Sequence, residues 1–238
     1  MTRNPETIEG VIDFLQDYSD QIPRFYESYT WNSRSPEDSH RELFDLEKEI
    51  STAAKLNCIK HSHLLKIAEW GKHPNKKKIS GPDPLNLILY DGGKPVVCLR
   101  FEPVNPICII EGRISGFGPT YSSKLLHFAV PEIYGALDTR LVRVFGNVSK
   151  DTSSYPMLDL NVTRPKKGRP SIPRDQPNWP EEYGTWVAIL NYYANVLNAN
   201  RIYCNHPPYY YDAGLRMNNQ WLPADVETAL FSYASMVL

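Results

Sequence analysis

Apolar residues recur at helical spacing through the first third of the chain. From Ile8 to Leu15 they occupy positions i, i+3, i+4 and i+7, which predicts an amphipathic helix. A second apolar stripe runs from Leu43 to about Leu56, and Ser35-Pro36 before it supplies an N-cap and a first-turn proline. A third helix is expected over 64–70, ended by Gly71.

The rest of the pattern is also helical, apart from one irregular stretch. Apolar residues over 96–108 fit a helix or a short buried strand, and we favour the helix. Strong stripes over 186–197 and over 223–233 predict two more helices. Residues 147–179 are rich in Pro, Ser, Asp, Lys and Arg with little apolar periodicity, which predicts an extended insertion. No segment alternates convincingly like a strand, so the expected fold class is mainly α.

Composition predicts a soluble globule and narrows the function classes. The 238 residues are 42% hydrophobic and 22% charged, which excludes a disordered or fibrous chain. No apolar run approaches the roughly 18 residues of a spanning helix, and the first residues lack a signal-peptide pattern. We therefore expect a cytoplasmic protein without a membrane partner. The net charge of −1 means that any nucleic-acid binding needs a locally basic face.

The cysteines argue against a metal or disulfide framework. Cys58, Cys98, Cys108 and Cys204 are scattered and show no C-x-x-C spacing. That pattern excludes a zinc finger, an iron–sulfur cluster and a secreted disulfide scaffold. We expect four buried free thiols and no metal site.

A glycine pair followed by proline is the first motif that points to chemistry. Gly116 and Gly118 flank Phe117 and permit a turn too tight for a Cβ atom, and Pro119 suits the first turn of the next helix. Such a hairpin directs backbone N–H groups at a helix N-terminus outward, where they can hold a phosphate. The same pattern is also typical of a structural turn between packed helices.

A second motif, ALDTRLVRV over residues 136–144, places Asp138 between apolar residues at the start of a helix. Together with ISGFGP over 114–119, it resembles the helix-hairpin-helix (HhH-GPD) superfamily of DNA glycosylases, a resemblance that lies within residues 104–146. In that superfamily the hairpin is typically L-P-G-V-G and the aspartate lies in V-D-T-H-I-x-R-V. The resemblance implies two all-helical subdomains that flank an active-site cleft.

On this resemblance the chain is a single glycosylase-like unit, 1–238, with a defined layout. Residues 60–146 form the subdomain with the helix-hairpin-helix motif and the catalytic aspartate. Residues 1–59 and 180–238 form the second helical subdomain, and 147–179 is a basic, Pro-rich insertion.

The resemblance implies that Asp138 is the catalytic residue and that the hairpin holds the DNA backbone. Cleaving a base from deoxyribose passes through an oxocarbenium-like sugar, which a carboxylate stabilises or attacks through an activated water. The competing interpretation makes Asp138 a helix N-cap. The expected DNA-binding residues are Ser115, Gly116, Phe117, Gly118, Thr120, Lys124, Lys166, Lys167 and Arg169.

One departure from the family pattern concerns strand cutting. In members that also cut the strand, a lysine stands two residues after the second hairpin glycine, and this chain has Thr120 there. Lys124 lies one turn later, where we expect a solvated or phosphate-facing lysine rather than a nucleophile. The predicted activity is that of a monofunctional DNA N-glycosylase, which leaves abasic sites without lyase cutting and needs no cofactor.

Two further features depend on DNA being the partner. A flipped base needs an aromatic pocket, for which Trp31, Trp70, Trp186 and Tyr192 are candidates, with core packing as the alternative for each. The segment Arg164–Pro170, RPKKGRP, resembles an AT-hook that lies in a narrow minor groove. An ordinary solvated loop is the alternative.

The base itself stays open at this point. We expect a monomer that acts on a modified or damaged base in double-stranded DNA. One role is base-excision repair, and another is defence against phage DNA with hypermodified, for example glucosylated, cytosine. A different class of function is a non-catalytic helix-hairpin-helix module that binds DNA or another protein.

Overall fold

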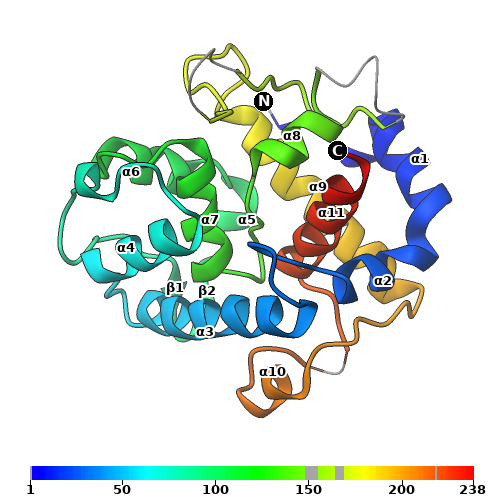
Figure 1. Ribbon diagram of the computed structural model, residues 1–238, viewed down its shortest axis with the longest axis horizontal. Coiled ribbons are helices and arrows are strands. Elements are labelled where there is room, and N and C mark those ends of the chain that lie inside the picture. The colour runs from blue at the N-terminus through cyan, green and yellow to red at the C-terminus, as the bar shows by residue number, and fades with distance from the viewer. Residues whose placement is uncertain (1, 148–154, 164–168, 218) are drawn as a thin grey trace.

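The computed structural model describes residues 2–147, 155–163, 169–217 and 219–238, and it is mainly helical as the apolar pattern predicts (Figure 1). The helices are α1 (Glu9–Tyr18), α2 (Ile22–Glu27), α3 (Pro36–Lys55), α4 (His61–Trp70), α5 (Cys98–Phe101), α6 (Asn105–Arg113), α7 (Pro119–Ala129), α8 (Thr139–Phe145), α9 (Glu181–Ala199), α10 (Pro208–Asp212) and α11 (Pro223–Val237). Short 3-10 turns cover Pro5–Thr7, Ser19–Gln21 and Lys76–Lys78. The strands β1 (Tyr90–Asp91) and β2 (Lys94–Pro95) pair antiparallel.

Local sequence signals account for several helix ends. At the start of α3 the hydroxyl of Ser35 accepts a hydrogen bond from the Asp38 amide at 3.1 Å, which confirms the predicted cap. The stretch over 96–108 is helical but interrupted, because a proline disfavours helical backbone angles in the residue that precedes it. Glu102, which precedes Pro103, has φ −127° and ψ 59° and separates α5 from α6.

The helices form two groups that meet along the middle of the molecule (Figure 1). In one group α7 packs against α3, α4 and α6, and in the other α11 packs against α2, α8 and α9. The sequence prediction had grouped residues 36–55 with the C-terminal helices. Helix α3 packs against α7, and its Glu47 is also joined through Arg216 to Asp225 of α11. A continuous apolar core runs through both groups.

Helix α9 fixes the loop that leads into α8. The indole N–H of Trp186 donates to the carbonyl oxygen of Ala136 at 2.9 Å, and the hydroxyl of Tyr183 donates to that of Gly135 at 3.2 Å. Both aromatic side chains are fully buried. The backbone immediately before Asp138 is therefore held by two buried hydrogen bonds, which limits its freedom to move.

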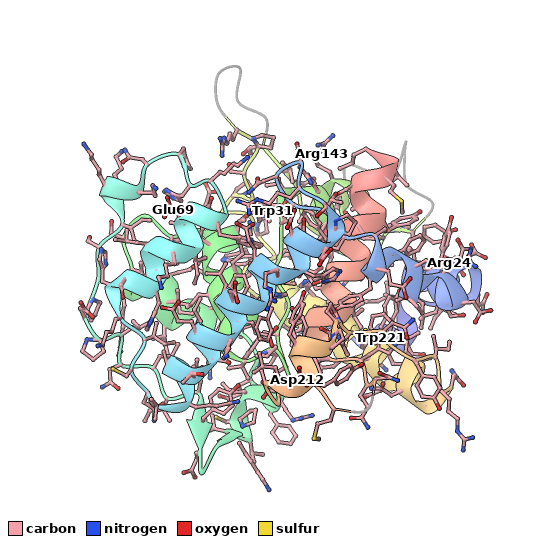
Figure 2. The ribbon with its side chains drawn as sticks, turned by 60° about the horizontal axis from the view of Figure 1, so that its bottom comes forward. Arg24, Trp31, Glu69, Arg143, Asp212 and Trp221 are labelled. Atoms are coloured by element: carbon pink, nitrogen blue, oxygen red, sulfur yellow. The ribbon has the colours of Figure 1, made fainter. Side chains whose placement is uncertain are left out.

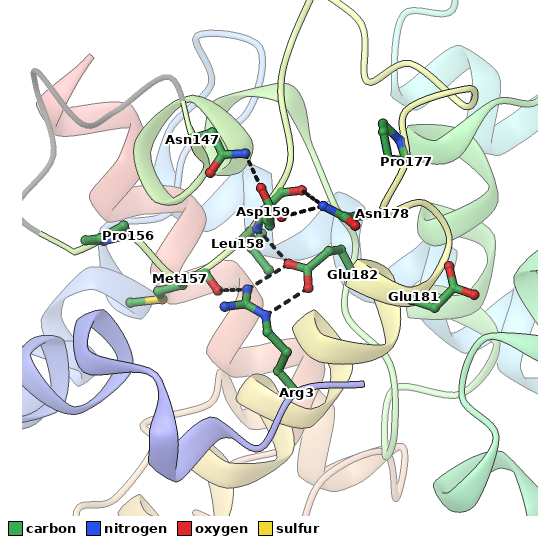
Figure 3. Close-up of a pocket in the computed structure, with 10 residues that line it drawn as sticks. All are labelled: Arg3, Asn147, Pro156, Met157, Leu158, Asp159, Pro177, Asn178, Glu181 and Glu182. Carbon is green, nitrogen blue, oxygen red and sulfur yellow. Dashed lines mark hydrogen bonds and ion pairs between the residues drawn. The ribbon is translucent and has the colours of Figure 1, made fainter. Parts of the chain in front are cut away.

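The described part of the predicted insertion is not wholly peripheral. Residues 155–162 form no helix or strand, as predicted for an extended insertion, but Met157, Leu158 and Leu160 are buried in the core rather than left unpacked. Figure 3 shows that Arg3, near the N-terminus, holds this segment in place. Its guanidinium donates hydrogen bonds to Glu182 and to the Met157 carbonyl oxygen. Arg3, Met157 and Glu182 also line a cavity of about 550 Å³.

Two expectations from composition have different outcomes. Cys204 is buried, but Cys98 and Cys108 are exposed and Cys58 is half-buried, so the expectation of four buried thiols is wrong. Scattered positions on amphipathic elements do not report burial by themselves. Among the described residues, every helix is too short or too polar to cross a lipid bilayer.

Candidate functional site

Asp138 stands at the N-terminus of α8 and uses its two carboxylate oxygens differently. Oδ1 accepts a hydrogen bond from the Arg140 amide at 3.0 Å, which is the expected N-cap contact. Oδ2 lies 3.4 Å from the ammonium nitrogen of Lys124, and the side chain is 14% exposed. The N-cap interpretation is therefore correct for one oxygen, and the other oxygen is left for another role.

Lys124 is buried, so the expectation of a solvated or phosphate-facing lysine is wrong. Its side chain is 4% exposed. The ammonium nitrogen lies 4.9 Å from the ring centre of Trp31, 5.0 Å from that of Trp70 and 5.4 Å from that of Tyr121. One carboxylate and three aromatic faces thus stabilise the charged form of this amine. The sequence could not reveal this, because the aromatic partners on other elements come close only in the fold.

Trp31 and Trp70 form an aromatic wall beside the Lys124–Asp138 pair. Their rings stack with centres 4.8 Å apart, and the Trp31 indole N–H donates to the Trp70 carbonyl oxygen at 2.9 Å. Figure 2 shows Trp31 between α4 and α11, and its ring packs on Phe231 of α11. The guanidinium of Arg140 lies over the rings of Trp31 and Phe231, at 5.9 and 5.1 Å from their centres.

The other two aromatic candidates lie elsewhere. Trp186 is fully buried, and its indole N–H donates a hydrogen bond to the Ala136 carbonyl oxygen. Tyr192 is partly buried against the core beside Tyr193. Neither residue lines a cavity next to Asp138. Neither residue is therefore a pocket residue. Trp186 lies in the buried apolar stripe of α9, and Tyr192 lies at the edge of that stripe.

Asp138 borders an outer cavity of about 650 Å³ that extends to the loop between α6 and α7. The loop contributes Gly116 and Gly118, and α7 contributes Thr120, Tyr121 and Lys124. On its other sides the cavity is lined by residues that include Trp31, His73, Arg140, Arg169 and Ile172. The cavity thus connects the glycine-rich loop with the carboxylate.

The fold requires glycine at position 116 but not at position 118. Gly116 has φ +85°, and a Cβ atom there would lie 2.9 Å from the Lys78 carbonyl oxygen. Gly118 has an ordinary φ of −109°, and a Cβ atom would contact nothing. Among the described residues, the amide N–H groups of Gly118 and Thr120 have no hydrogen-bond acceptor. They leave unpaired donors at the N-terminus of α7, beside the outer cavity.

The Ser115 amide and the Phe117 ring, in the same loop, are both engaged by the protein. Ser115 exchanges both backbone hydrogen bonds with Ser80, so its amide is not free for a phosphate. The ring of Phe117 is 2% exposed and packs on Tyr121. Its carbonyl oxygen accepts a hydrogen bond from Arg174. The loop is short, so its apolar residue turns into the core.

The basic segment is described only in part. Lys166 and Lys167 lie outside the described residues, so the predicted contacts of their side chains have no structural description. Arg169 and Pro170 line the outer cavity, and Arg169 donates to the Lys72 carbonyl oxygen. The C-terminal end of the segment is therefore at the mouth of the site.

A second, inner cavity lies behind the Lys124–Asp138 pair. It has a volume of about 20 Å³ and shares Trp31, Lys124 and Asp138 with the outer cavity. Its deeper lining includes His127 and Glu227. Sequence reasoning missed both residues, although each is a polar residue within the apolar stripe of its helix, α7 or α11, which is a detectable signal.

A buried group of potential metal ligands is already saturated by protein partners. Cys204, His206 and Asp225 lie within 4.8 Å of one another. The Asp225 carboxylate binds the Arg216 guanidinium, and Arg216 also pairs with Glu47. Arg216 lowers the pKa of Asp225, although burial opposes this effect. We interpret the group as a structural ion network between α3 and α11.

Comparisons with known proteins do not place the chain in a family. No protein-family model matches it, and no curated protein and no solved structure is significantly similar. The geometry and chemistry of the site are the basis for a functional assignment.

Proposed function

We propose that the protein is a DNA N-glycosylase of the helix-hairpin-helix kind and that Asp138 is its catalytic carboxylate. The observation that carries the proposal is the position of Asp138. This residue lines both an outer cavity, bordered by a glycine-rich loop with unpaired amides, and an inner cavity with aromatic walls. A phosphate site, a carboxylate and an aromatic pocket in that order match what an extruded nucleotide requires.

The carboxylate suits the chemistry of N-glycosidic cleavage. As the base leaves, positive charge develops on the sugar, and a preorganised negative group beside it stabilises the transition state. The cap hydrogen bond through Oδ1 fixes the orientation of the Asp138 side chain. Oδ2 can then face the sugar or a water molecule without a rearrangement of α8.

The α6–loop–α7 arrangement supports a role in gripping the DNA backbone. The free amides of Gly118 and Thr120 lie at the N-terminus of an eleven-residue helix, where the helix dipole favours a negative charge. The missing Cβ of Gly118 leaves open space in which a phosphate can approach. Arg169 at the cavity rim adds positive charge.

The environment of Lys124 supports hydrolysis rather than strand cutting. A lysine that attacks a sugar carbon needs its amine free to approach that carbon. The Lys124 amine is instead held by the carboxylate of Asp138 and enclosed by the faces of Trp31, Trp70 and Tyr121. We therefore propose a monofunctional enzyme in which Lys124 positions Asp138.

The second candidate function is a non-catalytic module that binds DNA or protein. The loop alone would serve such a module, but the charged pair buried among aromatic rings has no role in it. Burial of an ion pair gives little net stability. The Lys124–Asp138 pair therefore favours an enzyme.

The test is a search for released bases. The protein is incubated with bacterial DNA, with phage DNA that contains hypermodified cytosine and with chemically damaged DNA, and the filtrate is analysed by mass spectrometry. Release of a base, with an intact abasic strand left behind, supports the proposal and distinguishes repair from phage defence. Tight binding to all these DNAs without release of any base supports the non-catalytic module.

A further inference from the structure

The inner cavity contains polar groups that the fold leaves without hydrogen bonds. His127 is 2% exposed, and neither of its ring nitrogens has a hydrogen-bond partner in the described part of the chain. Its Nδ1 atom is 3.2 Å from Oε2 of Glu227, but the two groups lack the alignment of a hydrogen bond. Buried polar groups are nearly always hydrogen-bonded, so the two unpartnered ring nitrogens of His127 beside a cavity indicate a missing ligand.

A third polar group lies in the same cavity. The hydroxyl of Tyr29 keeps its proton, because burial and the nearby carboxylates of Glu227 and Asp138 raise its pKa well above the ordinary value. Tyr29 lines the inner cavity together with His127 and Glu227. The cavity therefore offers the carboxylate of Glu227 as an acceptor, and a phenol and an imidazole as donors.

The aromatic walls of the cavity already carry cations. Lys124 lies over the faces of Trp31 and Trp70, and Arg140 lies over Trp31 and Phe231. Of these two cations only Lys124 lines the inner cavity, and a positively charged base would meet its ammonium group on the Trp31 and Trp70 faces rather than a free aromatic cage. A neutral planar base meets no such repulsion and can stack between the Trp31 and Trp70 rings when these rings separate.

We infer that the inner cavity is the base-recognition site and that Glu227 and His127 read the hydrogen-bonding edge of a neutral base. This inference rests on the proposed glycosylase function and names its substrate class. The class is a neutral base that presents an N–H donor next to a carbonyl or ring-nitrogen acceptor. Cationic alkylated purines are excluded from it.

Entry of a base requires the partition between the two cavities to open. The inner cavity, at about 20 Å³, holds about one water molecule. Trp31 and Lys124 line both cavities and form the partition. Movement of these side chains lets the base pass while Asp138 stays fixed by its cap.

The experiment compares base release by the wild type, by Glu227→Gln and by His127→Asn. The substrates are duplexes with one uracil, 5-hydroxymethylcytosine, 8-oxoguanine or 7-methylguanine, together with the natural DNA from which the wild type releases a base. Glu111→Gln is the matched control, because Glu111 is a half-buried carboxylate that lines neither cavity. Binding to a duplex with a tetrahydrofuran abasic analogue is measured for every variant.

We expect release of a neutral base and none of 7-methylguanine. Glu227→Gln and His127→Asn should each lower release of the preferred base about tenfold to a hundredfold, the effect of losing a hydrogen bond to a charged or buried group. The ratio of rates between neutral bases should change, and binding to the abasic duplex should not. Glu111→Gln should behave as the wild type.

Three outcomes overturn the inference. Preferred release of 7-methylguanine contradicts the neutral substrate class. Unchanged rate ratios in both Glu227→Gln and His127→Asn contradict base reading by this pair and leave the glycosylase proposal intact. Release of no base by the wild type from any DNA contradicts both proposals. If one variant does not fold, the other decides, because the two residues lie on different helices.

Discussion

The ammonium nitrogen of Lys124 lies 3.4 Å from Oδ2 of Asp138, although the two side chains come from different helices. Among the described residues, the contact holds the only lysine amine that lines the two cavities against the proposed catalytic carboxylate. Whether that amine can leave Asp138 and reach a sugar carbon decides between hydrolysis and strand cutting in the proposed function.

The first prediction concerns this amine. Because Asp138 and three aromatic rings hold the amine in place, we expect no covalent protein–DNA adduct when the wild type is treated with borohydride during turnover. The abasic strand should break only after alkali. Lys124→Met, which keeps the volume without an amine, should give the same trapping result. An adduct with the wild type that disappears in Lys124→Met would show that Lys124 is a nucleophile.

The second prediction separates the two loop glycines. Gly118→Val should fold normally, because its backbone is unstrained and its Cβ position is open. It should lose DNA affinity, because the side chain blocks the approach of a phosphate to the free amides. Gly116→Ala should instead lower the melting temperature, because the residue needs φ +85° and its Cβ would meet the Lys78 carbonyl.

The measurements are thermal unfolding and fluorescence anisotropy with a labelled duplex. Gly118→Val with unchanged affinity would mean that the loop is a structural turn only. A stable Gly116→Ala would contradict the account of the backbone strain.

The third prediction concerns the basic segment that ends at Arg169. Replacing Lys166, Lys167 and Arg169 with Ala should weaken binding to many sequences and lower the dependence of affinity on salt, because fewer counterions are released. Base release from saturated complexes should change less. The affinity is measured between about 50 and 200 mM salt, the range over which phosphate contacts make the affinity fall strongly. An identical salt slope in the variant would indicate a solvated loop.

The fourth prediction concerns pH. Burial lowers the pKa of His40 below its ordinary value of 6.5, against smaller opposing effects of Asp225 and of the Tyr26 carbonyl. Its Nε2 atom pairs with that carbonyl oxygen at 3.0 Å, and Nδ1 has no partner. A second proton would thus be buried without an acceptor. His206 adds a further small lowering.

The sign follows from proton uptake. As the pH falls below 6.5, the unfolded state binds a proton at His40 before the folded state does, so the free energy of unfolding decreases. The slope is at most about 1.4 kcal/mol per pH unit for one group. His40→Gln, whose amide can still donate to Tyr26, should reduce this slope in urea unfolding between pH 7 and 5. It should not abolish the slope, because the pKa of His63 is also lowered. Equal slopes for both proteins would contradict the prediction.

The sequence predicted the helices well where local signals determine them. Residues near each other in the sequence determine these features: the Ser35 cap, the end of α4 at Gly71 and the apolar stripes of α9 and α11. The position of Asp138 at a helix start was predictable for the same reason. Its contact with Lys124 was not, because that contact depends on how α7 and α8 pack.

The pocket shows the same limit. Trp31, Trp70 and Trp186 look alike in sequence, since each is a large aromatic residue near a helical stripe. Only the fold distinguishes Trp31 and Trp70, which stack on each other beside Asp138, from Trp186, which is buried and bonded to the Ala136 carbonyl oxygen. Tertiary contacts also decided that Phe117 turns inward and that α3 joins α7.

The central claim is that the charge of Asp138, and not its cap, serves catalysis. Asp138→Asn keeps the cap through Oδ1, because asparagine caps about as well as aspartate. Its loss of charge should reduce the rate by a hundredfold or more, on the order of 3 kcal/mol of transition-state stabilisation. Asp138→Ala is the matched control, which should also lose about 1 kcal/mol of stability with the cap.

The measurement is the single-turnover rate of base release from saturated duplex DNA, with unfolding and duplex affinity determined on the same variants. The account predicts that Asp138→Asn still folds, with a lower melting temperature because the buried Lys124 loses its carboxylate partner. The folded variant should bind duplex DNA as the wild type does but release the base at least about a hundredfold more slowly. A wild-type rate in Asp138→Asn would contradict it and leave Asp138 as a helix cap alone.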